Sequence, residues 1–112
     1  ILADAIEQSV VGIRARIGSG TTINNAYVMG NDYYETLEQI HENTAAGKPL
    51  IGIGERCIIE SAIIDKNCRI GNDVIIKGGK HLANRDHPLY AVKDGIVVVK
   101  KMAILPDGFV IE

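Results

Sequence analysis

Large aromatic side chains are nearly missing from this chain of 112 residues, which has no tryptophan, one phenylalanine and four tyrosines. Apolar residues still make up 46% of it, so we expect a core of Ile and Val rather than of packed rings. No apolar run approaches the roughly 20 residues of a membrane-spanning helix. The composition therefore favours one domain with a narrow aliphatic core and predicts no membrane partner.

The chain also has few cysteines and only a small net charge. The net charge is −2, so the chain lacks the basic balance of nucleic-acid-binding proteins, and no nucleic-acid partner is expected. Cys57 and Cys68 are the only cysteines; two cysteines make a poor disulfide framework, and they lack the companion ligands of a metal site. We interpret both as reduced thiols in the core, which points to a reducing compartment such as the cytoplasm or a plastid.

An aliphatic residue recurs every six positions in three stretches of the chain. The members are Val11, Ile17, Ile23 and Met29; then Ile58, Ile64, Ile70 and Ile76; then Val98, Ile104 and Val110. A second set of small residues falls between them and includes Ala15, Thr21, Ala62, Cys68 and Val74. A period of six fits neither a lone helix nor an ordinary strand and is typical of hexapeptide repeats. It predicts an all-β fold, a left-handed parallel β-helix in which three hexads form one coil of a triangular prism. The aliphatic residue and the small residue of each hexad are both expected to point into the prism.

The repeat is interrupted after Met29, where a helical pattern begins. Asp32 and Glu35 have the spacing of a capping box, and Leu37 and Ile40 share one helical face. A glycine and a proline follow the pattern as stop signals. We therefore predict one inserted helix at 32–46, with Leu37 and Ile40 docked on the side of the prism.

A second interruption covers 77–94, which is polar, glycine-rich and reads as a long basic loop. The β-branched run 96–100 predicts a strand, and 106–108 (Pro-Asp-Gly) predicts a corner turn. An uncovered last coil would expose strand edges, so some element should cap the C-terminal end, and Phe109 is expected to help close it.

Four stretches are more specific than the hexads. They are Ser9–Ile17 (SVVGIRARI), Met29–Glu35 (MGNDYYE), Ile63–Gly71 (IIDKNCRIG) and Asp94–Lys101 (DGIVVVKK). Together they resemble the C-terminal domain of the ADP-glucose pyrophosphorylase (glucose-1-phosphate adenylyltransferase) family, and the resemblance covers nearly the whole chain.

The resemblance implies an enzyme that transfers an adenylyl group from ATP to glucose 1-phosphate with Mg²⁺, releasing pyrophosphate, for glycogen or starch synthesis. In the family this chemistry belongs to an N-terminal, Rossmann-like nucleotidyltransferase domain. The chain starts with Ile1 instead of Met and shows no glycine-rich phosphate loop. We therefore expect 1–112 to be a single β-helix domain of a longer protein, with no catalytic residue, metal or cofactor of its own and no activity alone.

The resemblance also implies a regulatory role. Two lysines of the family's C-terminal domain contact phosphorylated effectors, and they match Lys66 in the IIDKN motif and Lys101 after the last long strand. Both are expected at corners of the prism, where an ammonium can pair with a phosphate. The sequence of the 77–94 segment differs from that usual in the family, so the resemblance does not identify the effector. The implied partners are the N-terminal catalytic domain and the other subunits of a homo- or hetero-tetramer.

Two other interpretations remain. Hexapeptide acyltransferases use a loop histidine as general base, and His81 and His87 lie in the 77–94 loop. That interpretation predicts acyl-CoA binding between neighbouring prisms. The other is an oligomerisation prism without any ligand.

Overall fold

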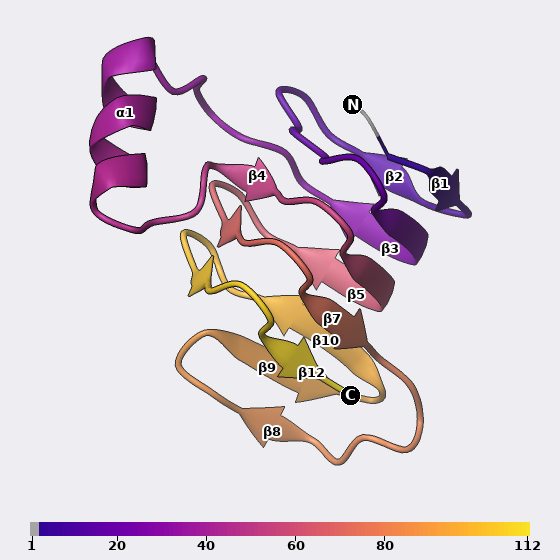
Figure 1. Cartoon of the computed structure of the whole chain (residues 1–112). Coiled ribbons are helices and arrows are strands. Elements are labelled where there is room, and N and C mark those ends of the chain that lie inside the picture. Colours follow the sequence, from indigo (N-terminus) through magenta and orange to yellow (C-terminus); the bar gives the residue numbers. More distant parts are fainter. Residues whose placement is uncertain (1–2) are drawn as a thin grey trace.

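A computed structural model describes residues 3–112, which form mostly short strands and one short helix (Figure 1). In chain order the elements are β1 (Ala5–Glu7), β2 (Val10–Val11), β3 (Thr22–Val28), α1 (Leu37–Ala45), β4 (Gly52–Ile53), β5 (Ile58–Ile64), β6 (Arg69–Ile70), β7 (Ile75–Lys77), β8 (Arg85–Asp86), β9 (Tyr90–Lys93), β10 (Ile96–Val99), β11 (Ile104–Leu105) and β12 (Val110–Ile111). The predicted all-β class is thus confirmed. No helix in the described part of the chain is both long and apolar enough to cross a membrane.

The strands stack in three parallel ladders that the chain visits in turn. The first ladder contains β1, the first half of β3, the first half of β5, β7 and β12. The second contains β2, the second halves of β3 and β5, and β10. The third starts with a bridge between Ile17 and Ile53 and continues through β4, β6 and β11. Each strand therefore pairs with its equivalent one coil further on, as the hexads predict.

The long strands β3 and β5 belong to two ladders because each bends at one residue. Asn25 (φ 51°) and Ser61 (φ 49°) adopt the left-handed backbone conformation at that bend. Arg56 (φ 56°) and Asp73 (φ 58°) do the same at the corner between the third and first ladders. Asn and Asp accept this conformation more readily than most residues, which explains why polar residues separate the aliphatic strands.

Ile and Val fill the space between the ladders, with several side chains exposed by 1% or less; these include Ile17, Ile23, Ile53, Ile59, Ile70, Ile76, Val74, Val97 and Val99. Of the predicted small inward positions, Thr21, Ala62, Cys68 and Val74 are buried as well, whereas Ala15 is half-buried. Cys57 and Cys68 are both buried, as predicted. The Thr21 hydroxyl donates to the Gly54 carbonyl oxygen (2.8 Å) and accepts from the Cys57 backbone N–H (3.1 Å), so this buried hydroxyl is satisfied.

Five of the predicted inward aliphatics lie outside the core: Met29, Ile58, Val98, Ile104 and Val110 are exposed or half-buried. Val11 is half-buried too, but it packs against the core. Their neighbours Val28, Ile59, Val97, Leu105 and Ile111 are buried instead. The cause is the two-residue period of a strand, in which a slip of one position exchanges the inward and outward faces. Where two aliphatics are adjacent, the hexad pattern alone does not decide which one points inward.

The inserted helix differs from the prediction in its start and its packing. It begins at Leu37, and Thr36 is the N-cap: its Oγ1 accepts from the Gln39 N–H (3.1 Å), while the Gln39 side chain accepts from the Thr36 N–H (2.9 Å). Leu37 is 86% exposed, so its predicted docking is wrong, and Ile40 is only half-buried. Figure 1 shows α1 standing off one side of the stacked strands.

The predicted loop 77–94 contains a β-hairpin instead. β9 pairs antiparallel with β10, and β8 pairs antiparallel with β9, so the hairpin ends the second ladder. Tyr90 and Val92 of β9 are each 5% exposed and belong to the core. Phe109 packs against the core in an edge-to-face arrangement with Tyr90, the two ring centroids 6.3 Å apart, which supplies the expected C-terminal closure.

Candidate functional site

Lys66 and Lys101 lie at the same corner, one coil apart. Lys66 follows β5 and Lys101 follows β10, and the register of these strands pairs Ile64 with Val99. A backbone hydrogen bond from the Met102 N–H to the Lys66 carbonyl oxygen (3.0 Å) continues this stacking around the corner. The Lys66 side chain is 44% exposed and Lys101 is exposed. The structure thus brings together two lysines that are 35 positions apart in the sequence.

Asn67 shapes this corner. It has a left-handed backbone (φ 62°) and is 8% exposed, and its side-chain oxygen accepts from the Asp32 backbone N–H (2.9 Å). Its amide nitrogen donates to Asp32 Oδ2 (3.1 Å). Asn67 therefore ties the start of the insertion to the coil. We call Asp32, Lys66, Asn67 and Lys101 the lysine corner.

The capping-box spacing predicted Asp32 at a helix cap, and its position in this cluster was not predicted. Asp32 Oδ1 lies 3.3 Å from Lys66 Nζ, with both side chains about half exposed. The hydrogen bond from Asn67, the contact with Lys66 and the charge of Lys101 together lower the pKa of Asp32 below its ordinary value. Asp32 is therefore ionised at neutral pH and is the counter-ion of Lys66.

The neighbouring Lys100 has a different partner. Its Nζ lies 2.7 Å from Asp86 Oδ1, so it joins the corner to strand β8, and it lowers the pKa of Asp86. Within the described residues 3–112, Lys101 makes no ion pair. Its ammonium is thus the one at the corner that keeps its charge available to a ligand.

A second carboxylate, that of the buried Glu35 side chain, anchors the insertion to the coil. Glu35 is 3% exposed and accepts from the Ile51 N–H (2.7 Å), from Asn43 (2.8 Å) and from Arg69 (3.0 Å). Burial by itself raises the pKa of Glu35, but the hydrogen bonds from Ile51, Arg69 and Asn43 outweigh it and the pKa is lowered. Arg16 adds a bond from its Nε to the Ile51 carbonyl oxygen (2.8 Å). The insertion is therefore fixed to the coil on both sides of α1.

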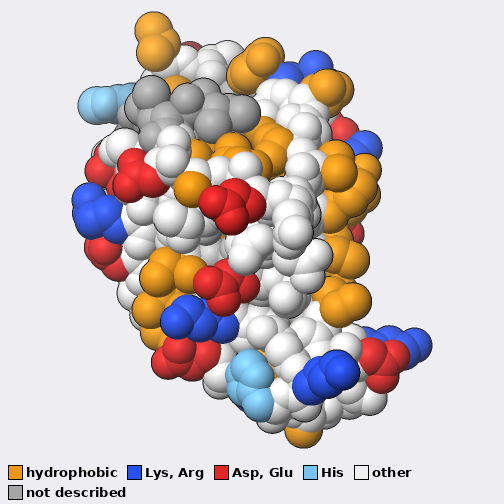
Figure 2. Space-filling view, turned by 90° about the vertical axis from the view of Figure 1, so that its right-hand side faces the viewer, with side chains coloured by type: hydrophobic (Ala, Val, Ile, Leu, Met, Phe, Trp, Pro, Cys, Tyr) orange, Lys and Arg blue, Asp and Glu red, His pale blue; other side chains and the backbone are white. Residues whose placement is uncertain are grey.

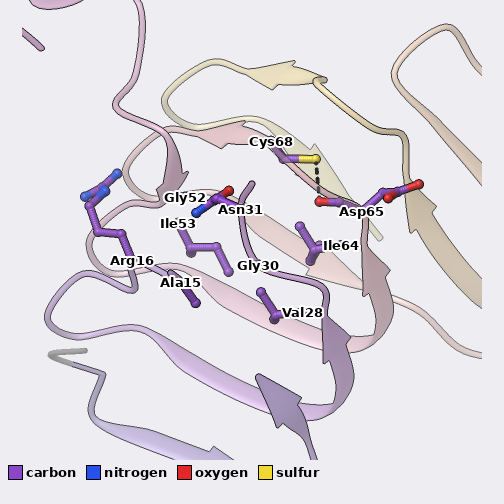
Figure 3. A pocket seen from close by; sticks show the side chains of 10 residues that line it. All are labelled: Ala15, Arg16, Val28, Gly30, Asn31, Gly52, Ile53, Ile64, Asp65 and Cys68. Atoms are coloured by element: carbon purple, nitrogen blue, oxygen red, sulfur yellow. Dashed lines mark hydrogen bonds between the residues drawn. The ribbon is translucent and has the colours of Figure 1, made fainter. Parts of the chain in front are cut away.

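The interior beside the corner offers no room for a ligand. Figure 3 shows Val28, Ile53 and Ile64 pointing toward one another there, and the cavity has a volume of about 10 Å³, roughly that of one water molecule. Cys68 lies at its edge and donates to the Asp65 carbonyl oxygen (3.2 Å). Burial raises the pKa of Cys68 to about 11, so this thiol is not a nucleophile at neutral pH. A ligand of the lysine corner must bind on the outer surface.

The two histidines of the acyltransferase interpretation do not meet at a site. His81 is exposed. The His87 ring stacks on Tyr90 with centroids 4.5 Å apart, and its Nδ1 accepts from the Leu89 N–H (3.1 Å). This bond assigns the proton of the neutral ring to Nε2 and leaves no lone pair for a general base. His87 therefore supports the C-terminal hairpin.

Two other kinds of binding site are a charged surface patch and a metal centre. On the face shown in Figure 2, basic and acidic side chains are interspersed, so outside the grey residues this face has no basic patch for nucleic acid. Among residues 3–112 there is also no group of His, Cys, Asp and Glu that could hold a metal ion.

Comparisons with known proteins agree with the resemblance carried by the four sequence stretches. The family described as the GLGC left-handed parallel beta-helix domain matches residues 1–110. The chain is 43% identical over 108 residues to the glucose-1-phosphate adenylyltransferase large subunit 1, chloroplastic/amyloplastic, of Zea mays. The match covers 95% of this chain and 21% of that relative, so the chain spans about a fifth of the relative's length. The predicted family resemblance is confirmed.

Proposed function

This chain belongs to the family of GLGC left-handed parallel β-helix domains, and from that premise we propose that it is the C-terminal regulatory and oligomerisation domain of a glucose-1-phosphate adenylyltransferase. Its three ladders are then the faces of a left-handed triangular prism. The complete enzyme makes ADP-glucose and pyrophosphate from ATP and glucose 1-phosphate, with Mg²⁺ and ATP bound by a catalytic domain outside these residues. The relative's name includes a plastid location, which is one of the two compartments expected for this protein.

The lysine corner is the proposed effector site. The observation that carries this is the stacking of Lys66 and Lys101 on successive coils, since two exposed ammonium groups at one corner suit a phosphorylated small molecule. Parallel strands lie about 4.8 Å apart, a spacing that lets one phosphate, or a phosphate and a carboxylate of one ligand, approach both side chains. The packed interior supports binding from outside.

The test uses the full-length enzyme that carries this domain. Lys66→Gln and Lys101→Gln each remove one cation, and Lys93→Gln removes an exposed lysine of β9 as a matched control. Enzyme activity is measured at increasing concentrations of 3-phosphoglycerate, and separately of fructose 1,6-bisphosphate, as candidate activators. We expect each corner variant to need about tenfold more activator for half-maximal effect, because a charged hydrogen bond contributes about 1.5–3 kcal/mol. The rate without activator should not change.

The control should behave like the wild type in every assay. An activator response that is the same in the wild type and in both corner variants would refute the effector site. In that case the domain would retain only its proposed oligomeric role, in which it contacts its own catalytic domain and the other subunits of a tetramer.

A further inference from the structure

We propose that Asp32 is a built-in competitor of the effector: its carboxylate occupies Lys66 in the absence of ligand, and an incoming anion must displace it. The inference rests on the proposed effector site and adds its regulation. Asp32 Oδ1 lies 3.3 Å from Lys66 Nζ, the position that an anionic oxygen of a ligand would take.

Asp32 is held in this place by Asn67, so the contact is specific. The Asp32 N–H donates to Asn67 Oδ1 (2.9 Å), and Asp32 Oδ2 accepts from Asn67 Nδ2 (3.1 Å). The remaining oxygen, Oδ1, is the one that faces Lys66. One oxygen therefore fixes the carboxylate and the other neutralises the lysine.

The same geometry makes displacement inexpensive. The Asp32 side chain is 49% exposed, so it can turn into water and stay solvated when an anion arrives. Exposed ion pairs contribute little to stability, so the competition lowers effector affinity by a small factor without closing the site. Lys101, which makes no ion pair among the described residues, supplies the second cation in both states.

Displacement of the Asp32 carboxylate from Lys66 would also affect the inserted segment that carries α1. Asp32 stands at the start of the segment that carries α1, and the next anchor, Glu35, is only three residues further on. When the Asp32 side chain leaves Lys66, the segment between these two anchors loses one of its attachments to the coil. The occupancy of the corner is thus coupled to the mobility of the first residues of the insertion.

Asp32→Asn tests the competition, because an amide keeps an acceptor for Asn67 but loses the charge. Asp73→Asn is the matched control: it removes one negative charge from another exposed ion pair, with Arg56 (2.8 Å), at a different corner. Binding of inorganic phosphate to the full 112-residue chain is measured by isothermal titration calorimetry at fixed low ionic strength. Asp32→Asn should bind phosphate about two- to fivefold more tightly than the wild type.

Lys66→Gln separates the possible results. The gain from Asp32→Asn should vanish when Lys66→Gln is added, and Asp73→Asn should bind like the wild type. If Lys66→Gln weakens phosphate binding but Asp32→Asn does not strengthen it beyond the control, the competition is wrong and the effector site stands. Phosphate binding that is absent, or that is unchanged in both Lys66→Gln and Lys101→Gln, would refute the effector site together with the competition.

Discussion

Glu35→Ala is expected to lower the free energy of unfolding by about 3 kcal/mol, because Glu35 is the buried anchor of the insertion. Its side chain is 3% exposed, and its carboxylate accepts three hydrogen bonds, one each from Ile51, Asn43 and Arg69. Alanine removes all three acceptor contacts without supplying a substitute.

The magnitude follows from what each partner loses. Breaking a buried ion pair by removing one member costs about 3–5 kcal/mol, since the other charge stays buried. Arg69 is 16% exposed and keeps one bond, to the Pro49 carbonyl oxygen (3.1 Å), so the lower end of that range applies. Glu35→Gln retains one oxygen acceptor but no charge, and should cost about half as much.

Urea unfolding followed by far-ultraviolet circular dichroism measures these differences. Glu38→Ala is the control, because Glu38 lies in the first turn of α1 and is exposed. It should shift the free energy by no more than about 0.5 kcal/mol. A Glu35→Ala variant as stable as Glu38→Ala would contradict the anchoring role.

The effect of pH gives a second check. The pKa of Glu35 is lowered from its ordinary value of 4.5, so the unfolded state binds the proton more readily than the folded state. The stabilisation is therefore complete above pH 4.5 and is lost as the pH falls through the lower, folded pKa. The stability difference between wild type and Glu35→Gln should shrink over that interval.

Two further predictions concern the core thiol and the N-terminal end of the stack. Because burial raises the pKa of Cys68 to about 11, iodoacetamide at pH 8 should leave this thiol unmodified in the folded chain and alkylate it in urea. Mass spectrometry measures the labelling. Rapid labelling of Cys68 in the folded chain would contradict its burial. Ile6 is 37% exposed, whereas its ladder partner Ile23 is 1% exposed, so the 112-residue chain should self-associate through this end of the stack. Ile6→Asp should weaken the association. A wild type that sediments as a monomer at every concentration would refute the prediction.

The period of six was sufficient to predict the parallel stacking and the small buried positions, because each coil repeats the same inward constraint. It could not settle the phase of the strands. At Ile58 and Ile59 two identical side chains are adjacent, and only the pairing of Ile59 with Ile23 and Ile76 shows which one is buried. The choice depends on how many residues each corner uses, which is a property of the corner's backbone.

The insertions were located correctly, but their contents were not. Asp32 and Glu35 have the spacing of a cap, yet both carboxylates bind the coil, and Thr36 with Gln39 forms the capping box one turn later. The coil residues that pair with these carboxylates, Lys66, Asn67 and Arg69, are more than 30 positions away, so no local pattern could reveal them. The 77–94 hairpin was missed because its pairing depends on the neighbouring strand β10.

The antiparallel direction of β9 limits how this architecture can change in length. A duplicated coil placed between β1 and β7 would meet parallel neighbours on both sides, so its backbone bonds would form as in every other coil. A coil added beyond β9 would face a strand that runs the opposite way and carries β8 on its other edge. Repeat duplication can therefore lengthen the second ladder only on the side of β10 that is away from the hairpin. On the other side the hairpin stops the addition of further coils.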